Sequence, residues 1–378
     1  MNCDFLLSIV IANRNRAEPV IRAALSLLDQ TDDPLDIIIV DDCSETDLSA
    51  EYALLQSLGV RVITQASHLY GPAARNSGVR AAQGSHVSFL DSDDIWLPGR
   101  YDEIRRFYSQ PENTGAVLVG GAVLHIDGEI RHVTQPPWRP GSSLLDYVYR
   151  DAARVQTSML SMPVELALSY PFDETLRVNQ DTDLAMRLDL AGVGFAVSNT
   201  PTLVKEETSD SNRLTMDRRT ADLSYQWYGR VIDNFSAGAK SGYHLQDRVW
   251  RLADSGRRAE AIFCLLHTLM PPVSLRETMR RALSITLGDH YYSRLRDGYR
   301  ILLKDPVRSE CAEQILARWQ RLSRDAARIC GESDGPDSNI ASRWPGQPRH
   351  RQGTAAASAE QTPRLHTHSN RRANFPTT

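Results

Sequence analysis

Two groups of aspartates are the residues of this chain whose types and spacing could do chemistry. Asp91, Asp93 and Asp94 lie within "FLDSDD", directly after an apolar run, and Asp41 and Asp42 follow another apolar run in "VDDCS". Carboxylates this close together repel one another. The fold must therefore bring a cation or hydrogen-bond donors to compensate their charge.

The spacing of Asp91 and Asp93 indicates a site for a divalent cation. Hard ions such as Mg²⁺ and Mn²⁺ prefer oxygen ligands and keep positions for water and for substrate phosphates. Residues two apart share a side of an extended segment, so both carboxylates can face one ion. The alternative is a plain turn and helix cap, since Asp and Ser favour both. The position of the motif after a buried strand favours the cation site.

The segments around these aspartates predict an open parallel sheet with helices on its faces. Residues 6–12 and 35–40 are nearly continuous apolar runs rich in β-branched residues, which is typical of strands buried on both faces. Such sheets bind ligands beyond the carboxyl ends of their strands, where both groups of aspartates fall. The remaining helices and strands of this part are expected at residues 18–30, 46–59, 60–65, 71–84 and 86–91.

The pattern changes twice along the rest of the chain. A less regular mixture of strands and helices extends to about Lys205 and includes an expected helix at residues 180–192. The chain then becomes helical, and from Gly331 onwards it has few apolar residues, which predicts disorder. We therefore expect an α/β domain, a helical C-terminal region and a disordered tail, at residues 1–205, 206–330 and 331–378.

Composition excludes several classes of protein. The 378 residues are 41% hydrophobic and carry a net charge of −4, which favours a soluble protein with a large core and argues against a general nucleic-acid binder. The five cysteines form no CxxC pair, as expected in a reducing cytosol. We expect neither a secretory signal nor a membrane span, and hence a cytoplasmic protein. Arg-rich helices such as residues 275–287 could still rest on an anionic membrane surface.

Five motifs, taken in order, resemble the family 2 glycosyltransferases, and the resemblance covers about Leu6 to Lys205. It implies a GT-A fold and an inverting transfer of a sugar from a nucleoside-diphosphate-sugar to a hydroxyl acceptor. It also implies a glycan or lipid-linked acceptor, bacterial-type polysaccharide or glycoconjugate synthesis, and Mn²⁺ or Mg²⁺ as the cofactor. The motifs are "LSIVIANRNR", "IIIVDDCS", "GPAARNSG", "FLDSDDIWLPGR" and "NQDTDLAMRL".

The resemblance assigns the nucleotide side of the site to five residues. Asp41 or Asp42 would hydrogen-bond the nucleobase, with a helix cap as the alternative for Asp42. Arg75 would lie near the base or the diphosphate. Asn13 and Arg14 replace part of the Pro-Thr-Tyr-Asn sequence usual in the family, and the planar guanidinium of Arg14 could stack where relatives have an aromatic ring.

The same resemblance divides the roles of the three clustered aspartates. Asp93 would be the main metal ligand, Asp91 would contact the metal or the ribose, and Asp94 would support them or cap a turn. A histidine common in relatives has no clear counterpart near "LVKEETSDSN", where Glu206 or Glu207 could take its place.

Asp181 is the candidate catalytic base. An inverting transfer needs one carboxylate that takes the proton of the acceptor hydroxyl. Relatives commonly have Glu-Asp at this point, whereas this chain has Gln180 before Asp181. The missing charge would leave Asp181 a weaker base than is usual in the family. A helix cap is the alternative for Asp181, and Asp183 is expected to be structural.

Two other functions stay open at this point. A nucleotide-sugar pyrophosphorylase has a related sheet, but its glycine-rich signature is absent, since "ANRNRAEP" contains no glycine. A scaffold protein with a degenerate donor site is the second, because Gln180, Arg14 and Cys43 all depart from the family pattern.

Overall fold

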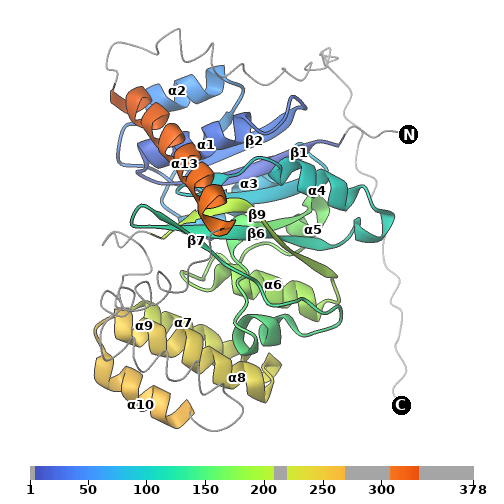
Figure 1. Ribbon diagram of the computed structural model, residues 1–378, viewed down its shortest axis with the longest axis vertical. Helices are drawn as coiled ribbons and strands as arrows, with labels where there is room; N and C mark the ends of the chain where they lie inside the picture. The colour runs from blue at the N-terminus through green and yellow to red at the C-terminus, as the bar shows by residue number, and fades with distance from the viewer. Residues whose placement is uncertain (1–4, 208–218, 269–306, 332–378) are drawn as a thin grey trace, which may run out of the picture. The chain divides into compact units, whose positions relative to one another are not determined.

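The computed structural model describes residues 5–207, 219–268 and 307–331. Its first four strands are parallel and lie in the order β3-β2-β1-β4 (Figure 1). The predicted parallel sheet is therefore confirmed in this part of the chain. The strands are β1 (Leu7–Asn13), β2 (Leu35–Asp41), β3 (Arg61–Thr64) and β4 (His86–Asp91).

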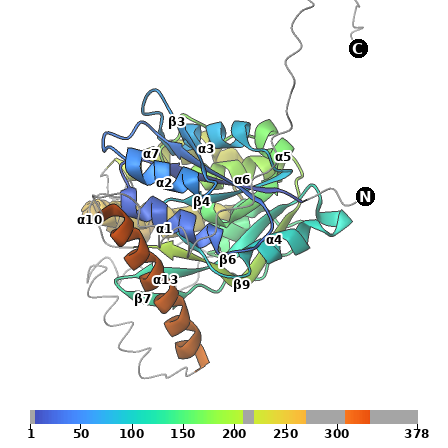
Figure 2. The ribbon, with the colours of Figure 1, turned by 90° about the horizontal axis from the view of Figure 1, so that it is seen from above.

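Helices connect these strands and cover both faces of the sheet. Figure 2 shows α1 and α4 on one side of the strands and α3 and α5 on the other. This double covering explains why β1 and β2 are continuously apolar, since neither face of these strands meets water. The helices are α1 (Ala17–Leu28), α2 (Ser49–Ser57), α3 (Tyr70–Ala81), α4 (Arg100–Tyr108), α5 (Val164–Ser169) and α6 (Gln180–Leu190).

The second half of the sheet mixes strand directions. Among the described residues nine strands form one sheet, which continues from β4 in the order β8-β6-β9-β5, with β7 beside β6. β8 is antiparallel to both β4 and β6, whereas β6 and β9 are parallel. The strands of this half are β5 (Ile95–Trp96), β6 (Val117–Ile126), β7 (Glu129–His132), β8 (Leu160–Pro163) and β9 (Phe195–Glu206).

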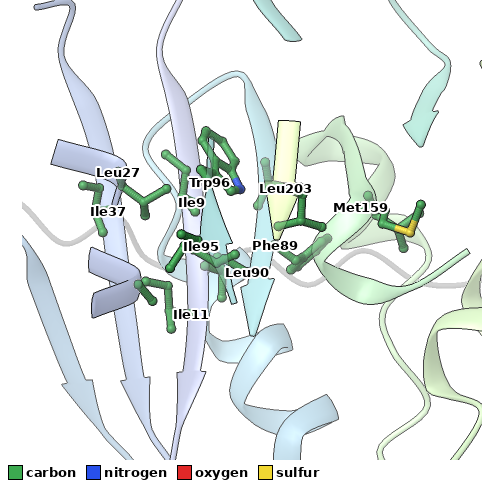
Figure 3. Close-up of a cluster of buried hydrophobic side chains, with 14 of the residues drawn as sticks. Ile9, Ile11, Leu27, Ile37, Phe89, Leu90, Ile95, Trp96, Met159 and Leu203 are labelled. Carbon is green, nitrogen blue, oxygen red and sulfur yellow. The ribbon is translucent and has the colours of Figure 1, made fainter. Parts of the chain in front are cut away.

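One large apolar core lies between the sheet and its helices. Figure 3 shows Trp96 beside Ile9 of β1, with Ile11 further along the same strand. These three side chains are fully buried. Burying one such side chain contributes about 1.5–3 kcal/mol to the free energy of unfolding. The core thus fixes the strands whose ends carry the aspartates.

The helical region after β9 divides into two parts. Its first helices form two smaller clusters, one of which joins Trp227 and Tyr243 to Met186 of α6. The long helix α13 (Val307–Gly331) instead returns to the first domain and packs against α1 and β7 (Figure 2). The structure therefore places α13 with the α/β domain, apart from the other helices of residues 206–330. Those helices are α7 (Thr220–Val231), α8 (Ala237–Tyr243), α9 (Val249–Asp254) and α10 (Arg258–Thr268).

Two predictions concern residues outside the described ranges. The disordered tail at residues 331–378 is one, since only Gly331 of it is described, and the membrane-surface helix at residues 275–287 is the other. Within the described part of the chain, every helix is too short or too polar to cross a bilayer.

Candidate active site

The parallel register brings the ends of three strands together at one edge of the sheet. Asn13 at the end of β1 is level with Asp41 at the end of β2, and Ala12 is level with Asp91 at the end of β4. The predicted convergence of the two groups of aspartates at the carboxyl edge is therefore confirmed. The segment Asp91–Asp94 after β4 is called the acidic loop below.

Asp91 is held between two cationic side chains. Arg75 Nη2 of α3 donates to its Oδ1 at 2.8 Å, and Lys205 Nζ of β9 lies 3.3 Å from its Oδ2. Burial alone would raise the pKa of Asp91, but the Lys205 ammonium and the Arg75 guanidinium outweigh it and hold this pKa well below its usual range. Asp91 is therefore ionised at neutral pH.

Asp94 is the innermost residue of the acidic loop and is fully buried. Its carboxylate accepts hydrogen bonds from Ser158 Oγ, from the backbone N–H of Glu206 and from Lys205 Nζ, the last at 2.7 Å. Burial would lower the pKa of Lys205, but the carboxylates of Asp94 and Asp91 raise it above its ordinary value. Lys205 is thus a built-in cation that compensates the repulsion within the loop, and Asp94 anchors the loop.

Asp93 is partly exposed and has an arginine partner of its own. Its side chain is 22% exposed, and Arg16 Nη1 lies 2.9 Å from its Oδ2. The backbone carbonyl of Asp93 accepts from Arg22 Nη2 at 3.2 Å. The loop therefore turns Asp94 towards the core and leaves the side chains of Asp91 and Asp93 partly exposed, at 26% and 22%.

The carboxylates of the acidic loop fit a hard divalent ion that is also bound by substrate phosphates. Within the described ranges, no three His, Cys, Asp or Glu side chains gather as a preformed metal cage. Mg²⁺ is commonly held by one or two carboxylates together with substrate phosphates, which does not require such a cage. Asp93 and Asp91 are both partly exposed and could serve in that mode, and each also pairs with a cation: Asp93 with Arg16, and Asp91 with Arg75 and Lys205.

Asp41 and Asp42 also differ in their hydrogen-bond partners. Asp41 accepts from the backbone N–H and the hydroxyl of Ser44, which closes the turn after β2. Asp42 is buried, and its carboxylate accepts from the N–H groups of Leu69 and Tyr70 at 2.7 Å each and contacts His68 Nδ1. Asp42 therefore caps the start of α3, which is the helix that carries Arg75.

The loop after β1 is joined to the loop after β2. Asn13 Nδ2 donates to the Tyr52 hydroxyl at 2.9 Å, and its buried Oδ1 has no hydrogen-bond partner among the residues that the structure describes. Arg14 pairs with Glu45 at 2.7 Å. Cys43 adopts a φ of 56°, the left-handed conformation that glycine takes readily. The turn therefore keeps a glycine-like path although its residue is a cysteine.

Arg75 joins the sheet edge to α6. Besides Asp91 it bonds to Gln180, with 2.8 Å between Nη1 and Oε1. A neutral amide at residue 180 can accept from the guanidinium while leaving the negative charge of Asp91 as its main ionic partner. The amide that departs from the family pattern thus has a structural role in this chain.

Asp181 lies in the first turn of α6, within the electrostatic reach of the acidic loop. Burial is the main cause that raises its pKa above the ordinary value; the N–H of Thr182 acts in the opposite direction, and the charge of Asp91 raises it further. The loss of the acidic neighbour at Gln180 therefore does not leave the pKa of Asp181 low. Asp183 pairs with Arg187 and accepts from the Trp227 indole, which joins α6 to α7, as its expected structural role requires.

Four residues of this region escaped the sequence analysis: Lys205, Arg16, Arg22 and His125. His125 Nδ1 of β6 lies 2.7 Å from Glu206, one of the two glutamates expected near the end of the domain. Glu207 pairs instead with Arg154. Arg16 ends the first of the five motifs but had no role assigned, and nothing in the local sequence marks the other three side chains, because their partners come from distant elements.

Comparison with known proteins finds similarity mainly in the first part of the chain. Residues 8–162 match the family model of Glycosyl transferase family 2. The amylovoran biosynthesis glycosyltransferase AmsB of Erwinia amylovora is 28% identical over 209 residues, which cover 52% of this chain and 68% of that protein. The succinoglycan biosynthesis protein ExoO of Rhizobium meliloti is 34% identical over 112 residues, 30% of this chain and 31% of that protein.

A solved structure shows a weaker likeness. The mannosyltransferase PcManGT from Pyrobaculum calidifontis, in complex with GDP-Man and Mn²⁺, is 14% identical with a TM-score of 0.48 and covers 87% of this chain and 88% of that chain.

The sheet with its helices defines an α/β protein, and sheets of this kind bind ligands beyond the carboxyl ends of their strands. The match to the family model over residues 8–162 supports the predicted resemblance to the family 2 glycosyltransferases in this part of the chain, which contains the first four of the five motifs. The sheet with helices on both faces agrees with the GT-A fold expected for this family.

Proposed function

We propose that this protein transfers a sugar from a nucleoside-diphosphate-sugar to a hydroxyl group of a glycan or lipid-linked acceptor, with inversion at the anomeric carbon. One observation carries the proposal. The Arg75 guanidinium bonds both to Asp91 at the end of β4 and to Gln180, the neighbour of Asp181. It thereby ties the expected base to the edge of the sheet where the donor would lie.

Asp181 would act as the general base. Its carboxylate takes the proton of the acceptor hydroxyl while the hydroxyl oxygen attacks the anomeric carbon and the diphosphate leaves. A carboxylate with a raised pKa accepts a proton more readily than an exposed aspartate does, as long as it is ionised at the working pH. Burial of Asp181 thus supports the role that its position in the motif suggests.

The leaving diphosphate would meet fixed positive charge on this chain. Arg75, Lys205 and Arg16 all contact carboxylates of the acidic loop. Cations placed where negative charge develops stabilise a transition state without reorganising. Asp93, with Asp91 beside it, would hold Mn²⁺ or Mg²⁺, which when bound would neutralise charge on the diphosphate.

The nucleotide would lie over the ends of β1 and β2. The unpartnered Oδ1 of Asn13 is a buried acceptor, and buried polar atoms in proteins are normally satisfied, so it suits a donor group of the ligand. Arg14 would stack on the base, Asp41 would bond to it, and Asp42 would support the pocket through α3. The bonds of Asp42 to Leu69 and Tyr70 support this indirect role over direct contact with the base.

The names of the relatives suggest the setting. Two of them act in the biosynthesis of amylovoran and of succinoglycan, so we propose that this chain also takes part in polysaccharide synthesis. A cytoplasmic location with peripheral membrane contact remains a prediction.

A panel experiment tests the function. Nucleoside diphosphates with Mn²⁺ should raise the thermal midpoint of the chain, and one nucleotide-sugar should be hydrolysed slowly in the absence of acceptor. Asp93→Ala should abolish both effects, whereas the distant substitution Asp233→Ala should leave them unchanged. Absence of any thermal shift would favour the scaffold, and release of pyrophosphate from a nucleoside triphosphate and a sugar phosphate would favour the pyrophosphorylase.

A further inference from the structure

Trp319 of α13 contacts two side chains that connect to the acidic loop. Its side chain is 5% exposed and lies between two others. The guanidinium carbon of Arg22, from α1, is 4.0 Å from the indole centroid, and the His125 ring, from β6, stacks on the indole at 4.6 Å with 28° between the planes. One side chain of α13 thus contacts both elements that support the loop.

The first arm of this arrangement leads through Arg22 to Asp93. Arg22 is 8% exposed, and its Nη2 donates to the backbone carbonyl of Asp93 at 3.2 Å. Its Nη1 donates to Ser323 Oγ, also in α13, at 3.3 Å. A cation over an indole is held more firmly when both are shielded from water, as they are here. The indole therefore restricts a long side chain that could otherwise adopt several rotamers.

The second arm leads through His125 to Asp94. His125 Nδ1 lies 2.7 Å from Glu206 Oε2, and the backbone N–H of Glu206 donates to Asp94 Oδ1 at 3.0 Å. The two arms meet the acidic loop at the neighbouring residues Asp93 and Asp94. Together they connect residues more than two hundred positions apart in the chain.

We propose that Trp319 is a positioning residue for the acidic loop. It holds Arg22 against the Asp93 carbonyl and His125 against Glu206, and it thereby sets the place of the loop carboxylates. The catalytic meaning of this role rests on the proposed function, but the effect on the loop does not.

Hydrogen–deuterium exchange of the full chain tests the effect on the loop directly. Trp319→Ala should speed the exchange of peptides that cover residues 91–96 several-fold and leave peptides of β1 unchanged. Trp319→Phe keeps an aromatic face and should restore most of the protection. Arg22→Met breaks the first arm from its other end, so it should reproduce the change and add little to that of Trp319→Ala.

A matched control separates positioning from general packing. Leu322 is fully buried in the same helix, and Leu322→Ala should lower the thermal midpoint without speeding exchange in residues 91–96 to the same extent. Equal exchange in the two alanine variants, or unchanged exchange in both Trp319→Ala and Arg22→Met, would overturn the proposal.

A second experiment measures how Trp319 affects metal binding. Mn²⁺ alone is added to the full chain, and its binding is monitored by the decrease in the electron paramagnetic resonance signal of free Mn²⁺. Trp319→Ala should weaken this binding about tenfold, the lower end of what removing an outer support of a metal ligand usually costs. If the wild-type chain itself binds no Mn²⁺, the metal in the proposed function fails, while the exchange experiment still decides the role of Trp319.

Discussion

Lys205 is the side chain on which the charge balance of the acidic loop depends. It is buried and lies within 3.3 Å of both Asp91 and Asp94, so removing it leaves two carboxylates near the core without their shared cation. Breaking a buried ion pair from one side is costly because the remaining charge is uncompensated.

We therefore predict that Lys205→Met lowers the free energy of unfolding by about 3–5 kcal/mol. Urea unfolding followed by circular dichroism measures this loss. Adding Asp94→Asn should recover part of it, because one of the two stranded charges is then absent. Lys240→Met, a change in the separate helix α8, should cost less than about 0.5 kcal/mol; a similar loss in both lysine variants would contradict the assignment.

Asp181 gives a prediction that combines activity with pH. Asp181→Asn should reduce transfer by about 10²–10⁴-fold while donor and metal binding persist. The activity of the unsubstituted enzyme should fall as the pH drops through the raised pKa of Asp181, because the base must be ionised. A pH–rate profile with saturating donor measures this, and persistent transfer in the asparagine variant would remove Asp181 from the mechanism.

The same pKa shift has a consequence for stability. A carboxyl group whose pKa is higher in the folded chain than in the unfolded chain binds protons more tightly when folded. Its ionisation therefore costs stability as the pH rises from the ordinary pKa through the raised one. Asp181→Asn should be more stable than the unsubstituted chain at neutral pH, and this difference should vanish in acid below both pKa values; an equal difference at every pH would argue against the shift.

At the scale of elements, α3 carries Arg75 to the sheet edge and must pack closely on β1. Gly78 permits this approach, because a Cβ built at its position would lie 2.3 Å from Val10 Cγ1. Asp42 caps the same helix from the end of β2. The placement of Arg75 thus depends on a small residue at one point of the helix and on a buried carboxylate at its start.

We predict that Gly78→Ala lowers the free energy of unfolding by about 1–3 kcal/mol, because the methyl group forces α3 away from β1. The same change at Gly229, in α7, meets nothing within 4 Å and should stabilise the chain by about 0.5–1 kcal/mol. Chemical denaturation of the two variants measures both signs. Equal effects would show that helix propensity, and not the close approach, governs Gly78.

At the scale of the whole molecule, α13 completes a domain whose other elements end at β9. Its buried side chains Ile315, Trp319 and Leu322 belong to the same core cluster as the strands. Arg318 and Arg321 also pair with Asp29, at the end of α1. The helix thus closes a face of the α/β domain from a distant part of the chain.

Truncation tests this closure. A chain ending at residue 306 should lose several kcal/mol of stability, because each exposed core side chain forfeits about 1.5–3 kcal/mol. A chain ending at residue 331 should keep the thermal midpoint of the full chain, since the composition beyond it predicts no core. Scanning calorimetry compares the three lengths; equal midpoints for the chains ending at 306 and 331 would mean that α13 is dispensable.

The sequence by itself determined the elements and the edge of the sheet where the chemistry lies. Continuous β-branched runs and helical periodicity are local patterns, so β1, β2, β4, α3 and α6 could be predicted within a few residues of their observed bounds. Because the strands are parallel, Asp41 and Asp91 had to meet at one edge.

Only the tertiary structure decided which partner each charged side chain meets. Lys205 meets Asp94 from 111 positions away, Arg75 meets Gln180 from 105, and Arg22 meets α13 from 301. The energy of a charge depends on the distance and burial of its partners, and neither is written in the local sequence. The three aspartates of "DSDD" have the same chemistry in the sequence, and packing alone makes Asp94 a buried anchor and leaves Asp91 and Asp93 as partly exposed charges with different cationic partners.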